Sequence, residues 1–337
     1  MTRTVTLRSA GGLQLSLSTF GAAWLSCTVP LPDGSRRRVI LERVEPPDAA
    51  TQRAFLGATI GRYANRIGHG RIARGDQAWQ LATDPGSHHQ LHGGPQGFHA
   101  REWTIEAVDD ASATMTIVSP EGDQGYPGEL HAQVRYRLIE TMTIEMEAIA
   151  RVSTPSPVCL TNHAYFNLDG DAGDVRRHRL QIASQRYLPV DGELIPLGAL
   201  AEVQGTGFDF REAKTLQQDW LADEQQRQAG GYDHAYLLDA RCAEMREPAA
   251  VLTSADGALR LRVSTTLPAM QLYGGQFLQG IPSPSGAPYR ACAAIALEPQ
   301  FLPDSPNHPE WPQPSCWLQP GDTYRHVIRY AFEADAA

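Results

Sequence analysis

Regular alternation of apolar and polar residues is the feature that most restricts what this chain can fold into. In the stretch GLQLSLS, Leu13, Leu15 and Leu17 project to one face of an extended strand and the polar residues between them to the other. The segments TMTIEMEA (141–148) and LRLRV (259–263) repeat this pattern. A period of two gives each strand one buried face and one wet face, as in antiparallel sheets. The chain is therefore predicted to be all-β.

Turn sequences separate the alternating segments, and they are PDGS (32–35), SPEGDQGYPGE (119–129), SADG (254–257) and QPGD (319–322). With 30 Gly and 24 Pro, long helices are not expected, and only 212–229 indicates a short helix or an irregular segment. The length of 337 residues allows two domains, but no linker divides the chain. We expect a single domain over residues 1–337, folded as one large antiparallel β-sandwich with few short helices.

Charge and hydropathy exclude several kinds of partner. The formal net charge is -9 and no Lys/Arg-rich block occurs, so nucleic acid is not an expected partner. No apolar run approaches the ~18 residues of a membrane span, and Met1 is not followed by a secretory signal pattern. The chain is predicted to be cytoplasmic, without a membrane partner, and to work as a monomer or homodimer.

Motifs for common cofactors and for covalent catalysis are missing from the sequence. It contains no G-x-G-x-x-G, G-x-x-x-x-G-K or G-x-S-x-G, which removes the usual nucleotide-binding and α/β-hydrolase interpretations. The only lysine, Lys214, lies in a polar stretch and is a poor Schiff-base nucleophile. No cofactor is expected. The cysteines are scattered, form no C-x-x-C pair and are expected to be free thiols, and they are Cys27, Cys159, Cys242, Cys292 and Cys316.

Polar islands interrupt the alternating segments and supply candidate functional residues. Asn65 and Arg66, in IGRYANRI, combine amide and guanidinium donors suited to hydroxyl and carboxylate oxygens, although a solvated turn pair has the same sequence. His88, His89 and His92 raise the question of a metal site. No Asp or Glu stands at a ligand-like spacing from them, so no metal is expected. His92 is instead predicted to be presented at a strand end, beside glycines that allow a close approach.

Two acidic residues and one histidine complete this set. Asp233, after the Gly-Gly turn in GYDHAYLL, is either a turn acid or a site residue. Glu298 ends the apolar run AAIALE, so its strand either carries it inward or turns it to solvent. A buried carboxylate must be paired, hydrogen-bonded or shifted in pKa. His163, in CLTNHAYFNLDG, is either a packed imidazole or a proton-transfer group, and the local sequence does not decide.

Together these segments form the ordered pattern N-R, L-H-G-G, N-H-x-Y-F-N-L, Y-D-H, Q-x-Y and L-E-x-Q-x-x-P-D. With these spacers the chain resembles the aldose 1-epimerases, also called galactose mutarotases, from about residue 55 to 325. The stretches EGDQGYPG and FLPDSPNHPEWPQPSCWLQPG are especially similar to bacterial members. The resemblance implies an isomerase with a large β-sandwich that binds an aldose sugar in an open cleft on one sheet.

The resemblance also implies roles for single residues. His163 would be the general acid and Glu298 the general base of sugar ring opening and closure. The sugar hydroxyls and ring oxygen would be held by Asn65, Arg66, His92, Asp233 and Gln271. With reference pKa values of ~4.3 for Glu and ~6.5 for His, Glu298 is expected to be ionised near neutral pH. His163 is expected to be kept partly protonated by a nearby carboxylate.

Two departures from the family pattern leave the substrate preference open. Pro299 follows the catalytic glutamate where the family often has Thr or Ser, and Gln276 in YGGQF stands where it often has Asn. Aromatic residues are candidates for stacking on the sugar, although each is more often a core residue. These candidates are Tyr165, Phe166 and Trp103.

Two other functions compete with a free-sugar epimerase. A hexose-6-phosphate 1-epimerase on the same fold would need arginines near the cleft, and Arg62 and Arg66 are available in the sequence. A sugar-binding module without catalysis is the second alternative. It predicts that anomers relax only at the spontaneous rate, whether or not Glu298 is replaced.

Overall fold

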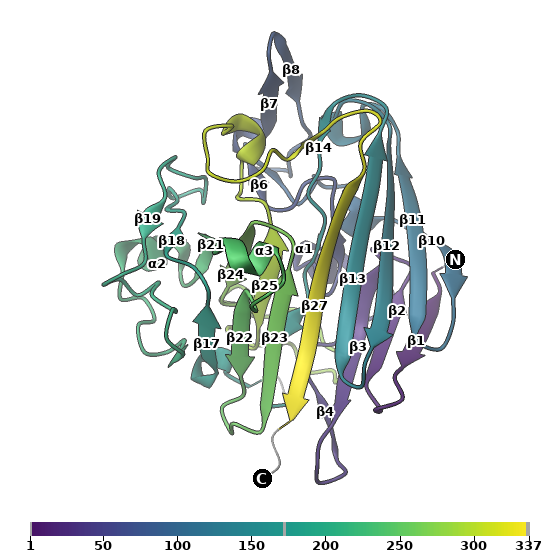
Figure 1. Cartoon of the computed structure of the whole chain (residues 1–337), viewed down its shortest axis with the longest axis vertical. Coiled ribbons are helices and arrows are strands. Elements are labelled where there is room, and N and C mark those ends of the chain that lie inside the picture. Colours follow the sequence, from purple (N-terminus) through teal and green to yellow (C-terminus); the bar gives the residue numbers. More distant parts are fainter. Residues whose placement is uncertain (1, 171–172, 335–337) are drawn as a thin grey trace.

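The computed structural model describes residues 2–170 and 173–334, and strands with their connecting loops dominate it. A nine-stranded antiparallel sheet fans across Figure 1, from β10 on the right to β17 on the left. In spatial order its strands are β10 (Thr104–Val108), β11 (Ser112–Ser119), β12 (Leu130–Ile139), β13 (Thr143–Val152), β27 (Tyr324–Ala334), β23 (Leu259–Thr265), β22 (Ala250–Thr253), β17 (Arg179–Ile182) and β20 (Lys214–Thr215).

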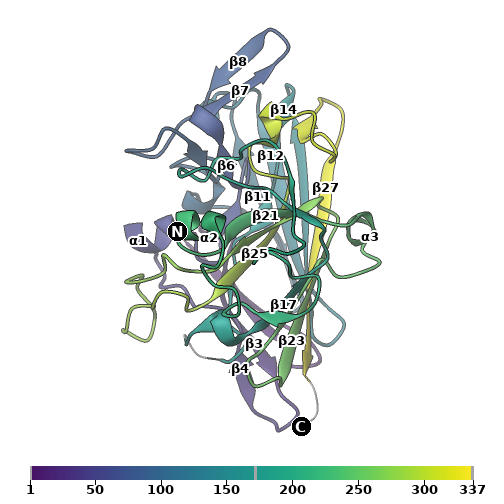
Figure 2. The same ribbon diagram turned by 90° about the vertical axis from the view of Figure 1, so that its left-hand side faces the viewer.

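A six-stranded antiparallel sheet forms a second layer, which the side view in Figure 2 separates from β23 and β27. Its order is β16 (Tyr165–Phe166), β25 (Ile295–Gln300), β24 (Ala269–Tyr273), β21 (Asp233–Leu237), β18 (Arg186–Tyr187) and β19 (Ala201–Glu202). A four-stranded sheet at the N-terminus consists of β1 (Thr4–Arg8), β2 (Gln14–Ser18), β3 (Ala23–Pro30) and β4 (Arg36–Arg38).

Short two-stranded pairs connect these layers. They are β5 (Thr59–Ile60) with β15 (Thr161–Asn162), β6 (Arg66–Ile67) with β9 (Gln90–Leu91), β7 (Arg71–Arg74) with β8 (Gln77–Gln80), and β14 (Ser156–Pro157) with β26 (Trp317–Leu318). The three α-helices of the described residues are all short, and they are α1 (Ala49–Arg53), α2 (Glu224–Ala229) and α3 (Ala240–Ala243). None of them is long and apolar enough to cross a membrane.

A shared hydrophobic core joins the three large sheets. The indole of Trp24, on β3, meets Tyr136 of β12 and Tyr330 of β27 edge-on, with ring centroids 6.0 and 5.1 Å apart. Phe166 of β16, in the six-stranded sheet, lies 6.5 Å from the same indole. Edge-to-face contacts of this kind contribute ~0.5–1.5 kcal/mol beyond burial. The core therefore ties the strand that follows His163 to the largest sheet.

The alternating segments fold as predicted. Leu13, Leu15 and Leu17 are fully buried at β2, and Ile144 and Met146 are fully buried on β13. The predicted antiparallel all-β sandwich is confirmed, because every paired strand described runs antiparallel to its partner and the sheets pack face to face. The five cysteines are free and buried, as expected.

The helix expected within 212–229 is present only in its last third. Lys214–Thr215 pairs with β17 as an edge strand, and the helix starts at Glu224. Gly230 ends it with a φ of 69°, a left-handed C-cap that glycine adopts readily. The helices α1 and α3 were not predicted, because four or five residues carry no measurable helical periodicity.

Candidate active site

A cavity of about 290 Å³, open to solvent, lies between the six-stranded sheet and the segment around α1. This volume is at the lower end of the range of small-molecule sites. Gln271 does not line it, but lies buried beneath it and bonded to Asp233. The other six predicted site residues form part of its wall, and they are Asn65, Arg66, His92, His163, Asp233 and Glu298.

Sheet topology brings distant parts of the chain together at this cavity. The neighbouring strands β25, β24 and β21 carry Glu298, Gln271 and Asp233, and β16 beside them begins two residues after His163. Gln271 and Glu298 are direct cross-strand partners. Side chains opposite each other on adjacent strands lie about 5 Å apart. Residues that are far apart in the sequence therefore converge on one patch of the sheet.

Glu298 is a buried carboxyl group without a complete set of partners. All six residues of β25 are buried, and the Glu298 side chain is 2% exposed. Its Oε2 has no hydrogen-bond partner among the described residues. Burial raises the pKa of Glu298 well above 4.5, Asp233 raises it further, and Arg66 partly offsets this. The inward orientation is as predicted, but burial favours the protonated carboxyl rather than the expected carboxylate.

His163 faces Glu298 inside the cavity. Its Nε2 lies 3.5 Å from Glu298 Oε1, and its side chain is 4% exposed. Burial lowers the pKa of His163 to about 4, and nearby His99 lowers it as well. The expectation that a carboxylate keeps His163 partly protonated is therefore wrong. Desolvation dominates, because the neighbouring Glu298 is itself favoured in its neutral form.

Asp233 is held by two neighbours. Gln271 Nε2 donates to Asp233 Oδ1 at 2.6 Å, and Arg66 approaches Asp233 Oδ2 at 3.8 Å. Burial raises the pKa of Asp233, while Arg66 and Gln271 lower it. The Oε1 of Gln271 is buried and has no partner among the described residues. Asp233 is thus a fixed acceptor in the cavity wall rather than a solvated turn acid.

Asn65 and His92 lock each other in place. The His92 N–H donates to Asn65 O at 3.0 Å, and the Asn65 N–H donates to His92 Nδ1 at 3.1 Å. Both residues have left-handed backbones, with φ of 70° and 51°. A Cβ on Gly93 would lie 2.0 Å from Gly61 O. The close approach predicted beside His92 is therefore that of the chain's own backbone.

His92, His163 and Glu298 offer three ligand atoms within 4.8 Å of one another, so a metal ion must be considered. The tautomer of His92 disfavours this. Because its Nδ1 accepts a backbone N–H, the proton of the neutral imidazole lies on Nε2. A metal would need the lone pair of that nitrogen. His92 is therefore arranged to donate to an oxygen in the cavity.

Backbone contacts fix the position of His163. Its N–H donates to Ala58 O at 2.9 Å, and its carbonyl accepts the N–H of Gly57 at 3.0 Å. The amide of Asn162 donates to Gly57 O at 2.8 Å. Gly57 has a φ of 67°, and a Cβ there would lie 2.0 Å from Trp24 O, so the position requires glycine.

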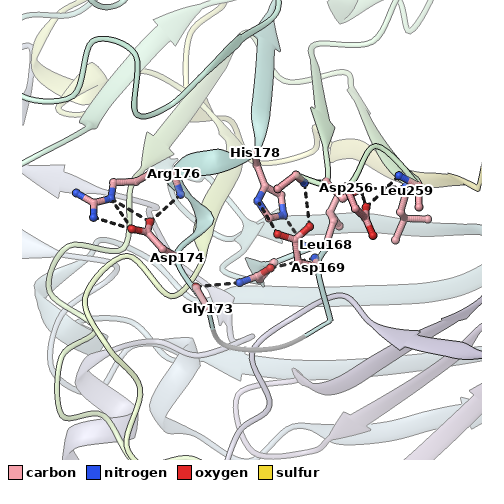
Figure 3. A network of polar contacts seen from close by, with 12 residues as sticks. Leu168, Asp169, Gly173, Asp174, Arg176, His178, Asp256 and Leu259 are labelled. Atoms are coloured by element: carbon pink, nitrogen blue, oxygen red, sulfur yellow. Dashed lines mark hydrogen bonds and ion pairs between the residues drawn. The ribbon is translucent and has the colours of Figure 1, made fainter.

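Another buried histidine anchors the chain where it leaves the site (Figure 3). His178 is fully buried, and its Nε2 accepts the N–H of Leu168 at 2.9 Å. Its Nδ1 lies 3.8 Å from Asp169 Oδ2. Asp169 Oδ1 accepts the N–H of Ala255 at 2.8 Å, which ties this segment to the turn containing Asp256. The end of the N-H-x-Y-F-N-L-D-G segment is therefore structural.

Arg62, one of the two arginines considered for a phosphate, is not available for one. It is 2% exposed, and its NH1 donates to the carbonyls of Pro127 and Gly128 at 3.1 and 2.9 Å. Its NH2 donates to the carbonyls of Ser119 and Pro120 at 2.6 and 2.8 Å. Its guanidinium therefore holds the loop after β11 and does not reach the cavity.

Only Tyr165 of the three proposed aromatic platforms lines the cavity. Phe166 is fully buried in the core, and Trp103 is 3% exposed with its indole N–H donating to Phe98 O. Phe166 and Trp103 are therefore core residues, which is the alternative that the sequence favoured for each.

Sequence reasoning missed most of the apolar part of the wall, which includes Phe55, Tyr273, Phe277, Leu278 and Ile281. A signal existed for two of these, since Tyr273 and Phe277 flank the glycines of YGGQF. Gln276 and Pro299 do not line the cavity. The amide of Gln276 instead donates to Ala229 O at 3.1 Å, which fixes the loop after β24.

The family model for aldose 1-epimerases matches residues 3–331. The chain belongs to the aldose 1-epimerase family. It is 48% identical over 333 residues to an aldose 1-epimerase of Escherichia coli (strain K12), covering 99% of this chain and 96% of that protein. It is 35% identical to the galactose mutarotase of Homo sapiens, covering 95% and 91% of the two chains. A solved structure, the GalM/aldose epimerase homologue from C. elegans, superposes with a TM-score of 0.90 at 29% identity over 100% of both chains.

Membership of the aldose 1-epimerase family confirms the predicted family and makes this protein an isomerase. The galactose 1-epimerase of Lactobacillus acidophilus NCFM has a TM-score of 0.83 at 28% identity and covers 100% of this chain and 99% of its own. These likenesses extend over the whole β-sandwich. The roles of individual residues rest on the geometry described above.

Proposed function

We propose that this protein interconverts the α and β anomers of free hexoses such as galactose and glucose, with Glu298 as general base and His163 as general acid. The observation that carries the proposal is the 3.5 Å approach of His163 Nε2 to Glu298 Oε1 inside the cavity. Relatives named aldose 1-epimerase and galactose mutarotase support the reaction and the sugar class.

Ring opening requires two proton transfers. The Glu298 carboxylate takes the proton of the C1 hydroxyl while the C1–O5 bond breaks, and O5 takes a proton from the Nε2–H of His163. The C1 aldehyde forms, rotation about C1–C2 presents its other face, and ring closure reverses both transfers. Positioned acid–base groups typically contribute ~10²–10⁴-fold each to such steps.

The pair shares a single proton through this cycle. With the cyclic sugar it is a carboxylate and an imidazolium, and with the open-chain sugar it is a neutral acid and a neutral imidazole. Burial favours the neutral form of the pair, since it lowers the pKa of His163 and raises that of Glu298. The protein environment therefore suits the open-chain intermediate, and the bound sugar oxygens must help to stabilise the ionised pair.

The surrounding side chains supply both kinds of hydrogen-bonding group for sugar hydroxyls. Asp233 accepts, while Arg66 and the Nε2–H of His92 donate. We assign Asn65 to the same polar wall. Gln271 holds Asp233 through its Nε2, and its buried Oε1 has no hydrogen-bond partner among the described residues.

A neutral sugar suits this cavity better than a hexose 6-phosphate. Arg62 is committed to backbone carbonyls, and Arg66 lies beside Asp233. Arg53 is the other arginine in the cavity wall, and it is exposed. Phosphate sites gain their strength from several charge-assisted hydrogen bonds, which one exposed cation does not provide.

Freshly dissolved α-D-galactose or α-D-glucose should reach anomeric equilibrium faster in proportion to enzyme concentration, as followed by polarimetry or proton NMR. Glucose 6-phosphate should show a lower kcat/KM than glucose, because its phosphate lacks a cluster of donors. A preference for the phosphate would reassign the protein as a hexose-6-phosphate 1-epimerase. If every free aldose relaxed at the buffer rate, the protein would be a sugar-binding module and the proposal would fail.

The pH dependence of kcat/KM should be bell-shaped, because the active pair carries one proton. On the acid side, activity is lost when the pair binds a second proton. That proton goes to His163, whose pKa is lowered to about 4. Loss of the shared proton removes it on the alkaline side, at a pH set by the raised pKa of Glu298. Rates corrected for spontaneous mutarotation should fall to half near pH 4. An acid limb at ~6.5, the value of a solvated histidine, would contradict the assignment.

The location and assembly of the protein remain predictions. We propose that it acts in the cytoplasm as a single domain over residues 1–337, as a monomer or homodimer. Light scattering of the purified protein would settle its oligomeric state.

A further inference from the structure

We propose that Phe55 is a positioning residue that keeps water away from the imidazoles of His92 and His163 and fixes the orientation of both rings relative to Glu298. The inference rests on the proposed roles of His163 and Glu298 and adds to them a residue without any hydrogen-bonding side-chain atom.

The phenyl ring of Phe55 stands among three imidazoles. Its centroid lies 4.6 Å from that of His92, 4.7 Å from that of His99 and 5.8 Å from that of His163. The rings of His92 and His163 are themselves 5.3 Å apart, at an angle of 80°. Phe55 also lines the cavity. It therefore fills space beside the proton-transfer histidine that water would otherwise occupy.

The backbone holds Phe55 firmly in this place. Its N–H donates to Gln52 O at 3.0 Å, and its carbonyl accepts the N–H of Ala58 at 3.0 Å. Its φ of 56° lies in the left-handed region, which a phenylalanine rarely adopts. The hydroxyl of Tyr165 donates to Ala54 O at 3.0 Å, which joins this turn to the strand after His163.

All three imidazoles around Phe55 are buried and favoured in their neutral form. Burial lowers the pKa of His99 to about 4 and that of His92 well below 6.5. A positive charge on His99 or His92 would lower the pKa of the other imidazoles around Phe55. The ionisable groups that share this environment, from every element around it, are His92, His99, His163, Tyr165, Tyr273, Arg53, Arg66, Asp233 and Glu298.

Removing the phenyl ring should let water reach His163 and raise its pKa from about 4 towards ~6.5. A rise of about one unit in Phe55→Ala would reduce the active fraction about threefold at about pH 4.5 and very little at about pH 7.5. At neutral pH, kcat should fall by about tenfold through lost orientation, with KM changed less than kcat.

The direct test is the NMR titration of His163 in protein labelled at the histidine ring carbons, with the resonance assigned from its loss in His163→Asn. Phe277→Ala is the matched control, because Phe277 also lines the cavity and has no ring contact with a histidine among the described residues. Phe55→Ala should move the midpoint upwards, and Phe277→Ala should leave it unchanged.

A folded Phe55→Ala with the wild-type midpoint, or an equal shift in Phe277→Ala, would overturn the proposal. If Phe55→Ala does not fold, Phe55→Leu decides, because leucine reaches fewer of the three rings and should give a smaller upward shift. No shift in that variant would also overturn it. The titration needs no catalysis, so loss of the proposed epimerase activity and loss of the positioning role are distinguishable.

Discussion

Glu298→Gln should lower kcat for anomer interconversion by about 10²–10⁴-fold, the contribution typical of a positioned general base. Glutamine keeps the shape of the side chain and its place opposite Gln271 on β24, but an amide cannot take the proton of the C1 hydroxyl. KM should change little, because the groups that hold the sugar hydroxyls remain. The effect is measured by polarimetry, as the rate of anomer interconversion after subtraction of the spontaneous rate. If Glu298→Gln kept the wild-type kcat, Glu298 would not be the general base.

The same substitution should raise the melting temperature at alkaline pH. The folded protein raises the pKa of Glu298 above 4.5, so protonation stabilises the fold below the unfolded pKa. This contribution to stability is lost as the pH rises through the pKa of Glu298 in the folded protein, because Glu298 then becomes a buried negative charge. Glutamine never ionises, so Glu298→Gln should melt a few degrees higher at about pH 9 and at a similar temperature near pH 4.

Glu147→Gln is the matched control for both measurements. Glu147 lies on β13 of the nine-stranded sheet and pairs with exposed Arg325 at 2.8 Å, outside the cavity. Its replacement should leave kcat unchanged and should not raise the melting temperature, since exposed ion pairs contribute only ~0–1 kcal/mol. A similar rise in both variants would mean that the burial of Glu298 is not the cause.

His163→Asn should also lower kcat by about 10²–10⁴-fold, because the ring oxygen then leaves without a proton donor. Asparagine is polar and smaller, so Glu298 keeps a hydrogen-bonding neighbour while proton transfer is lost. His88→Asn, at an exposed position outside the cavity, should retain wild-type kcat. Unchanged activity in His163→Asn would transfer the role of acid to another group, with His92 the nearest imidazole.

The double variant tests whether the pair acts as a unit. Groups that share one proton lose their joint function when either is removed, so their effects are not additive. The double variant of Glu298→Gln and His163→Asn should therefore be about as slow as the slower single variant. A loss equal to the product of the two single losses would show that the residues act independently.

Local sequence patterns were sufficient to predict the strands. They were not sufficient where the structure depends on contacts between segments that are distant in the sequence. The alternation at 141–148 and 259–263 predicted strands, since a period of two depends only on nearby residues. The short helix or irregular segment expected in 212–229 is present, but its position could not be predicted, because Lys214 joins the edge of a sheet next to Leu180, a contact made across the fold. Arg62 was misjudged for the same reason, since its carbonyl partners lie in a loop far along the chain.

By itself, the sequence determined the antiparallel all-β fold, the family resemblance and the chemical groups of the site. Only the tertiary structure decided that His163 and Glu298 meet at 3.5 Å, that both favour their neutral forms, and that Phe55 stands beside them. The physical reason is that alternation records only which face of a strand avoids water. The approach of two side chains depends on which strands become neighbours, and the pKa of each depends on everything that replaces its water.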